Sequence, residues 1–179
     1  MTPFVHLHVH TQYSLLDGLS SVTALVDKAL ADGMPGVAIT DHGNMFGVKE
    51  IYNYVNGGCL KGYKKKLEKA EKSGNTAKAE QIKGWIDRIK NKDFRLIIGC
   101  EMYVAQKSLT EVVDRHDKGR HLVVLAKNKT GYKNLIKLVS KAWTDGFYSH
   151  PRTDKHELEA HREGLIIASA CLGGEIPRL

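Results

Sequence analysis

The chain has 179 residues, of which 42% are hydrophobic and 26% are charged, a composition that predicts one globular domain with a sizeable core. It lacks an apolar run approaching the roughly 18 residues of a membrane span and a basic-then-apolar leader, so we expect a cytoplasmic protein without a membrane partner. The net charge of +7 indicates a polyanionic partner.

The first predicted element is a strand over residues 5–10, in which apolar residues alternate with three histidines. Side chains on a strand alternate between its faces, so His6, His8 and His10 are expected in one row. Imidazole is a common ligand of zinc and similar ions, and two rings spaced in this way can converge on one ion. The alternative interpretation is an edge strand with exposed histidines.

A polar loop that contains Asp17 follows, and then a helix is predicted over residues 22–32. A short buried strand over residues 35–40 ends at Asp41 and His42. If a crossover helix joins two parallel strands, both strands end at the same edge of the sheet. We therefore expect Asp41 and His42 beside the histidines of the first strand.

A helix is expected over residues 45–55, and a strongly basic segment follows it. Residues 57–95 contain twelve lysines and arginines against five acidic residues, an excess equal to the whole net charge. The apolar spacing predicts a helical hairpin over residues 57–93, inserted in a loop between a helix and a strand. Its lysines indicate either a nucleic-acid contact surface or an ordinary solvated face.

The remaining elements continue the alternation of strands and helices. A strand over residues 94–104 carries Glu101 near its end, and the neighbouring Cys100 is expected to be a core thiol on the opposite face. Residues 106–120 and 146–152 are predicted loops, and helices are expected over 130–143 and 155–161. A strand over 121–126 opens with His121, and the last strand, 165–170, ends at Cys171. The odd number and wide spacing of the three cysteines argue against a disulfide scaffold.

Seven side chains are thus expected near one edge of the sheet. Their mixture of imidazole, carboxylate and thiol groups suits zinc, manganese or iron better than calcium. Seven ligands are too many for one tetrahedral ion, and clusters of ions typically clamp phosphoryl oxygens and activate water for phosphoester hydrolysis. Taken singly, His121 can be a loop-end residue, Asp17 a helix cap and Cys171 a buried thiol. The candidate ligands are His8, His10, Asp17, His42, Glu101, His121 and Cys171.

These motifs resemble those of the PHP (polymerase and histidinol phosphatase) domain at the N-terminus of bacterial DNA polymerase III alpha subunits. The matching blocks run nearly end to end, although the basic hairpin replaces a shorter loop. They include His6-Leu7-His8-Val9-His10-Thr11, Ser14-Leu15-Leu16-Asp17-Gly18, Thr40-Asp41-His42-Gly43-Asn44, Ile98-Gly99-Cys100-Glu101, Thr130-Gly131-Tyr132 and Ala170-Cys171-Leu172-Gly173.

The resemblance implies an α/β fold, a distorted (β/α)7 barrel of the TIM type, with up to three ions held by the seven candidate ligands. It favours zinc, with manganese or iron as alternatives, and it places His6 and Asp41 in the second shell. Residues 1–179 are expected to be a fragment of this domain with an incomplete barrel, because the family's late Asp-x-His pair is missing. Two similar triplets, 114–116 and 154–156, do not follow apolar strands and are rejected as equivalents.

The resemblance also implies that the chain belongs to a DNA-directed DNA polymerase, although this segment lacks the polymerase site. Its own candidate activity is metal-dependent 3′→5′ exonuclease or other phosphoesterase chemistry. The implied partners are DNA, the remaining polymerase domains and other holoenzyme subunits, including a proofreading subunit. The alternatives are a non-catalytic structural and subunit-contact domain, or a free-standing PHP phosphatase. The seven retained ligands favour a metal-binding site.

Overall fold

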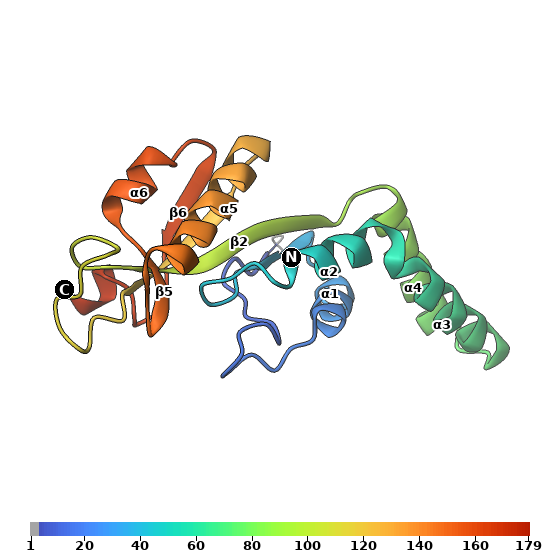
Figure 1. The fold of residues 1–179 in the computed structure, drawn as a ribbon. Helices are drawn as coiled ribbons and strands as arrows, with labels where there is room; N and C mark the ends of the chain where they lie inside the picture. The colour runs from blue at the N-terminus through green and yellow to red at the C-terminus, as the bar shows by residue number, and fades with distance from the viewer. Residues whose placement is uncertain (1–3) are drawn as a thin grey trace.

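The computed structural model describes residues 4–179 and shows a mixed α/β fold (Figure 1). The helices are α1 (Val22–Ala31), α2 (Val48–Asn53), the π-helix η1 (Tyr54–Gly58), α3 (Leu60–Lys72), α4 (Thr76–Lys90), α5 (Lys129–Thr144), α6 (Lys155–Ala160) and the 3₁₀-helix η2 (Ile176–Arg178). The strands are β1 (Gly36–Ile39), β2 (Arg95–Val104), β3 (Arg120–Ala126), β4 (Phe147–Tyr148), β5 (His150–Thr153) and β6 (Leu165–Ser169). Most elements lie where the sequence predicted them.

The long strand β2 organises the sheet, because it pairs with three other strands. Its first half runs parallel to β1, its second half runs antiparallel to β3, and its last two residues run parallel to β5. The sheet order is β4-β5-β2-β3-β6, with β1 beside the first half of β2. Over residues 4–179 this sheet stays open, so the closed barrel that the family resemblance implied is not formed by the described residues.

Parallel strands, which the (β/α)7 barrel of the resemblance implies, are not found throughout the sheet. The strand β3 is antiparallel to β2, and β6 is antiparallel to β3. The physical reason is the connection between β2 and β3, a loop without a helix, whereas a parallel pair needs a crossover. His121 nevertheless reaches the expected edge, because the start of β3 lies opposite the end of β2 and His121 pairs with Tyr103.

The strand predicted over residues 5–10 is not formed, and the segment is irregular. The segment follows β1 through the backbone bonds from Ala38 N–H to the His6 carbonyl (3.2 Å) and from Thr40 N–H to the Val9 carbonyl (2.9 Å). The three steps from His6 to Val9 thus run beside two steps from Ala38 to Thr40, and the chain bends at 7–8. The Val9 N–H turns instead to the Thr40 hydroxyl, at 2.7 Å. This irregularity breaks the side-chain alternation, so the three histidines do not form one row.

Residues 146–152, which were predicted to be a loop, contain the short strands β4 and β5 instead. The hairpin turns at Ser149, which has a φ of 60°, and β5 then adds to the end of β2 through Arg152 and Thr153. Residues 146–152 show no clear period of two in their apolar residues, so the sequence did not predict strands there. The strands form because β5 pairs with the end of β2.

Two hydrophobic cores lie on either side of the middle of β2. The first packs α1, β1, α2 and the hairpin α3–α4 around residues such as Val26, Ile51 and Ile82. The second packs α5 on β2 and β3 and contains Cys100, Met102 and Leu135. Cys100 is fully buried, as predicted, and burial raises the pKa of its thiol far above the usual range. No helix within residues 4–179 is long and apolar enough to cross a membrane.

The helices α3 and α4 form the predicted helical hairpin, which extends away from the rest of the fold (Figure 1). The carboxylate of Asp27 on α1 anchors the end of the hairpin that joins the rest of the fold. Asp27 accepts hydrogen bonds from the hydroxyls of Tyr54 (2.7 Å) and Tyr63 (2.5 Å), and the Lys66 ammonium lies 2.8 Å away. Burial alone would raise the pKa of Asp27, but these three donors outweigh burial and lower it.

We expect Asp27→Asn to destabilise the protein by about 1–2 kcal/mol at neutral pH, because a charged acceptor of three donors is lost. The lowered pKa means that the stabilisation is present above the ordinary pKa of an aspartate and is lost as the pH falls through the folded-state value. Urea unfolding of both proteins should therefore show a gap that shrinks below about pH 4. Asp32→Asn, at an exposed pair with Lys28, is the matched control and should change little.

Candidate metal centre

The centre of the candidate site is Glu101, which lies within β2 and is completely buried. Three imidazole nitrogens surround its Oε2 atom, and they come from two separate segments of chain. The Nε2 atoms of His8 and His10 lie 3.2 and 3.0 Å from Oε2, and the Nδ1 atom of His42 lies 2.8 Å from it. The strand thus places one carboxylate oxygen at the meeting point of three rings.

The other oxygen of Glu101 faces the start of β3 and the end of β6. The Nδ1 atom of His121 lies 2.8 Å from Oε1, and the sulfur of Cys171 lies 3.6 Å from it. The same sulfur is 3.2 Å from His121 Nδ1. The two oxygens of one carboxylate therefore face two different groups of potential ligands.

Asp17 completes the set from the first loop. Its Oδ2 atom lies 3.1 Å from the Nε2 atom of His42, the ring nitrogen that points away from Glu101. Gly43, directly after that histidine, has a φ of 59° and donates its N–H to the Glu101 carbonyl at 2.8 Å. A Cβ atom there would lie 2.5 Å from Pro151, so glycine permits the close approach of this turn to β5. All seven candidate ligands thus join one network of contacts.

Asp41 and Ser14 set the orientation of His10. Asp41 is buried and accepts hydrogen bonds from the Thr11 N–H (2.6 Å), the Thr11 hydroxyl (2.8 Å) and the Ser14 hydroxyl (2.8 Å). Ser14 uses its only proton in that bond, so it accepts from His10 Nδ1, which lies 2.9 Å away. His10 Nδ1 therefore carries the ring proton, and Nε2 presents a lone pair toward Glu101.

The electrostatics of the site favour a cation between these atoms. Glu101 Oε2 and His42 Nδ1 are buried, yet within residues 4–179 neither has a hydrogen-bond partner in acceptable geometry. His10 Nε2 lies 3.1 Å from His8 Nε2, so the two ring nitrogens nearest Glu101 Oε2 also lie close to each other. Acceptors that converge without donors are unfavourable unless a positive charge lies among them.

The pKa shifts of Glu101 and His42 come from the same close contacts between the carboxylate and the imidazoles. Burial alone would raise the pKa of Glu101, but its contacts with His10, His121 and His42 hold it far below the usual range. The contact with Glu101 raises the pKa of His42, against the opposing effect of burial, and Asp17 adds to the rise. The centre of the site is therefore an ionised carboxylate, which favours the charged form of His42 beside it.

Two groups of side chains have the separations of metal ligands. In each group, one potential ligand atom per residue lies within 4.8 Å of the others: His8, His10 and Glu101 form the first, and His42, Glu101 and His121 form the second. These His/Glu clusters can bind metal ions, and Glu101 belongs to both. The orphaned buried Oε2 atom and the donor set fit divalent cations.

His6, which was expected in the second shell, is exposed, and its ring packs edge-on against Phe4 at 4.8 Å between centroids. The rejected triplets also lie outside the cluster. Asp154 caps α6 by accepting the Glu157 N–H, and the side chain of His156 is 87% exposed. Asp114 accepts the N–H of His116 in an exposed loop.

Sequence reasoning did not identify two aromatic neighbours of the site. The ring of Tyr103 stacks on His42 and meets the rings of His121 and His150 edge-on, at 5.0 and 4.6 Å between centroids. Burial lowers the pKa of His150, with smaller effects from Lys118, His121 and His42. Period-two alternation along β2 places Tyr103 on the same face as Glu101, and this was the available signal.

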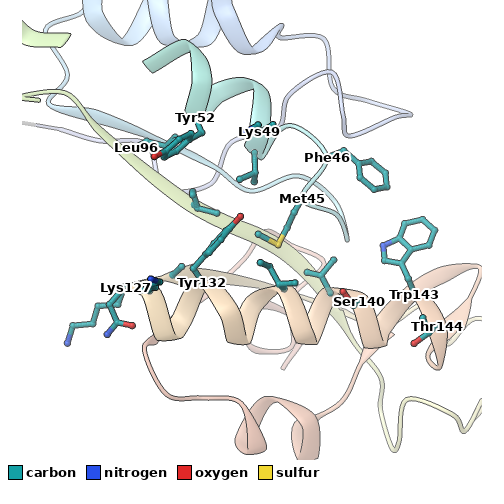
Figure 2. Close-up of a pocket in the computed structure, with 17 residues that line it drawn as sticks. Met45, Phe46, Lys49, Tyr52, Leu96, Lys127, Tyr132, Ser140, Trp143 and Thr144 are labelled. Atoms are coloured by element: carbon teal, nitrogen blue, oxygen red, sulfur yellow. The ribbon is translucent and has the colours of Figure 1, made fainter. Parts of the chain in front are cut away.

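A groove in the protein is separate from this cluster. It has a volume of about 960 Å³ and lies between α2 and α5, lined by residues such as Met45, Tyr132 and Trp143 (Figure 2). None of the seven candidate ligands lines it. Trp143 connects the two regions, because its Nε1–H donates to the Gly43 carbonyl at 2.8 Å.

Comparison with known proteins supports this arrangement. Residues 6–179 match the family described as PHP domain. This chain belongs to the PHP domain family. The PHP chain is 43% identical over 179 residues to the DNA polymerase III subunit alpha of Treponema pallidum, and 40% identical over 178 residues to that of Borreliella burgdorferi. The corresponding subunit of Thermus aquaticus is 38% identical over 186 residues.

Each of these matches covers 98% of the PHP chain but only 12–13% of the relative. The PHP chain is thus homologous to the N-terminal region of DNA polymerase III alpha subunits and spans about an eighth of their length. The histidine and glutamate clusters at Glu101 are consistent with a PHP metal site.

Proposed function

We propose that this PHP domain holds a cluster of divalent ions, with zinc favoured over manganese or iron, and hydrolyses phosphodiester bonds. The observation that carries the proposal is the buried Glu101 carboxylate, whose Oε2 atom has three imidazole nitrogens within 3.2 Å and no hydrogen-bond donor in acceptable geometry among the described residues. The proposed ligands are His8, His10, Asp17, His42, Glu101, His121 and Cys171.

The contacts assign a role to each of the proposed ligands. Glu101 would hold the ions together with His8 and His10, which lie at one of its oxygens, and with His121 and Cys171, which lie at the other. Ser14 and Asp41 fix the tautomer of His10. Bound ions would supply Lewis-acid stabilisation of phosphoryl oxygens and activation of water. Asp17 and Cys171 are exposed at the rim, where a substrate can approach.

The substrate class follows from the relatives, which are DNA polymerase subunits. We propose that the domain is part of a cytoplasmic replicative DNA polymerase and that its own reaction is removal of 3′-terminal nucleotides. Its partners would be DNA, the remaining polymerase domains and other subunits, including a proofreading subunit. Further strands are proposed to complete a distorted (β/α)7 barrel between β6 and the segment 5–10, and to add ligands for up to three ions.

The test combines metal content with hydrolysis. Elemental analysis of the 179-residue chain should find roughly two or more zinc-like ions per chain. The full-length gene product should shorten a 5′-labelled single-stranded oligonucleotide from its 3′ end with Mn²⁺ or Zn²⁺, and His10→Ala should lower that rate at least about 100-fold. His156→Ala, an exposed histidine outside the cluster, is the control and should keep the wild-type rate.

Two results would contradict the proposal. A metal-free chain after growth in metal-replete medium would leave the non-catalytic structural domain as the better interpretation. Equal hydrolysis by wild type and His10→Ala would indicate a contaminating nuclease. A gene that ends soon after Leu179 would favour a free-standing phosphatase, although the similarity to polymerase subunits over 98% of the chain argues against it.

A further inference from the structure

We propose that the outer face of α3 is a binding surface for the phosphate backbone of duplex DNA, separate from the metal centre. This surface, the α3 lysine row, consists of Lys61, Lys65, Lys69 and Lys72, all of which are exposed. The four residues follow the spacing i, i+4, i+8 and i+11, so they share one side of the helix.

The α3 lysine row lies opposite the side of the helix that packs on α4. Tyr63 and Ala70 are the buried residues of α3, and Leu67 is partly buried beside them. The 3.6-residue period places the lysine row about half a turn away from these three residues. The row therefore faces solvent along its whole length, on the hairpin that extends away from the rest of the fold (Figure 1).

The charges of this row are not balanced within the chain. Among the described residues, the ion pairs of the hairpin are Lys66 with Asp27 and Lys83 with Glu71, and neither uses a member of the row. The hairpin and its flanks carry the whole net positive charge of the chain. Glu68 is the acidic residue beside the row on the helix surface, so four lysines face one carboxylate there and keep an excess of positive charge.

Helix stability does not explain the row. Like charges at i and i+4 destabilise a helix, and Lys61–Lys65 and Lys65–Lys69 are two such pairs. Lys69 and Lys72 lie in the last turn, where the helix dipole favours cations, but Lys61 lies in the first turn, which has no acidic residue to offset it. Glu68, three residues after Lys65 and four before Lys72, offsets part of this repulsion, and a bound polyanion would offset the rest.

The base of the hairpin is rigid enough to present the row at a fixed place. Asp27 ties α3 to α1 through Tyr63 and Lys66, and Arg88 of α4 bonds to the Met34 carbonyl and covers the ring of Phe94. Glu71 and Lys83 link the two helices, 3.0 Å apart. The hairpin can therefore hold a ligand without first becoming ordered.

The geometry favours duplex DNA as the polyanion. Residues 61 and 72 are eleven positions apart, so the row extends about 16 Å along the helix. Each strand of a duplex carries a phosphate about every 3.4 Å of its axis, so a row of this length faces about five phosphates. A straight row of cations matches a straight, uniformly charged rod better than a protein surface of mixed charge.

The test measures how the affinity for a fluorescent 30-base-pair duplex depends on salt, with neutral substitutions that keep the helix. The triple variant Lys61→Gln, Lys65→Gln and Lys69→Gln should bind the duplex about tenfold more weakly at moderate salt. Its slope of log K against log salt should be shallower by about 2.7, because each of the three lost phosphate contacts contributes about 0.9. Circular dichroism should show unchanged helix content.

The helix α5 supplies the matched control. Lys129, Lys133 and Lys137 are exposed and have the same i, i+4, i+8 spacing, so changing all three to glutamine removes the same charge. This second triple variant should change the slope by less than about 1. Equal losses in the two triple variants would show diffuse attraction to net charge and would overturn the assignment to α3.

Two further results would also overturn the proposal. The first is a wild-type chain that does not bind the duplex at low salt. The second is displacement of the duplex by polyglutamate at equal charge concentration, which would indicate an acidic protein partner. The assignment does not depend on the metal centre, because no member of the α3 lysine row is among the seven candidate ligands.

Discussion

Replacing Glu101 with glutamine is expected to abolish metal binding at the centre, with a loss of affinity of more than about 100-fold. The amide keeps the shape of the side chain but supplies only one oxygen, so it cannot face His8 and His10 with one oxygen and His121 with the other. Elemental analysis after dialysis, together with titration of zinc against a chromogenic chelator, measures the effect.

The control for this substitution is Glu157→Gln, because Glu157 is also a buried carboxylate but pairs with Lys141 on α5, outside the cluster. It should retain the wild-type metal content even if it lowers stability. A Glu101→Gln chain that still binds two ions would show that Glu101 does not bridge them. Changes in unfolding should be measured on the metal-free proteins, because a bound ion stabilises the folded state by itself.

Replacing Arg152 with methionine is expected to destabilise the protein by about 3–5 kcal/mol, the largest stability effect that we foresee for a single substitution. Arg152 is 1% exposed, and its Nη1 atom lies 3.0 Å from the Asp117 carboxylate, which is equally buried. Its guanidinium also donates to the carbonyls of Leu109 (3.1 Å) and Gly146 (3.4 Å). Removal of the arginine leaves a buried carboxylate without its cation.

Guanidinium chloride unfolding measures this effect, and a second variant separates charge from packing. The double variant Arg152→Met with Asp117→Asn should be less destabilised than the sum of the two single variants, because the uncompensated charge is gone. Arg162→Met, at an exposed pair with Glu159, should change stability by less than about 0.5 kcal/mol. If the stability loss of the double variant equals the sum of the two single losses, Arg152 and Asp117 do not interact energetically.

The Arg152–Asp117 pair also links stability to the site. It closes the loop that joins β2 to β3, and His121 is the second residue of β3. The weakened loop should release His121 from Glu101. We therefore expect the effects of the Arg152 variant and of the metal-site variants on metal binding to be non-additive. Sequence reasoning assigned no role to Arg152, because an arginine in a polar, aromatic segment gives no local signal of burial.

The helices and most of the strands could be predicted from the sequence because they depend on local patterns. The apolar period of 3.6 identified α1, the hairpin α3–α4 and α5, while apolar runs identified β1, β2, β3 and β6. The direction of β3 was mispredicted, although its evidence was present: the polar loop before it contains no crossover helix. Strand direction depends on the connection, and the prediction considered only the strand.

The chemistry of the candidate site was determined by the sequence, since residue types and motif spacing alone pointed to seven potential metal ligands and to the PHP family. The tertiary structure decided how these residues meet. Glu101 became the centre because β2 is the only described strand that pairs with both β1 and β3, and the bend at 7–8 separated His6 from His8. Ser14, Tyr103 and Arg152 acquired their roles through contacts between residues distant in the chain, which local patterns do not record.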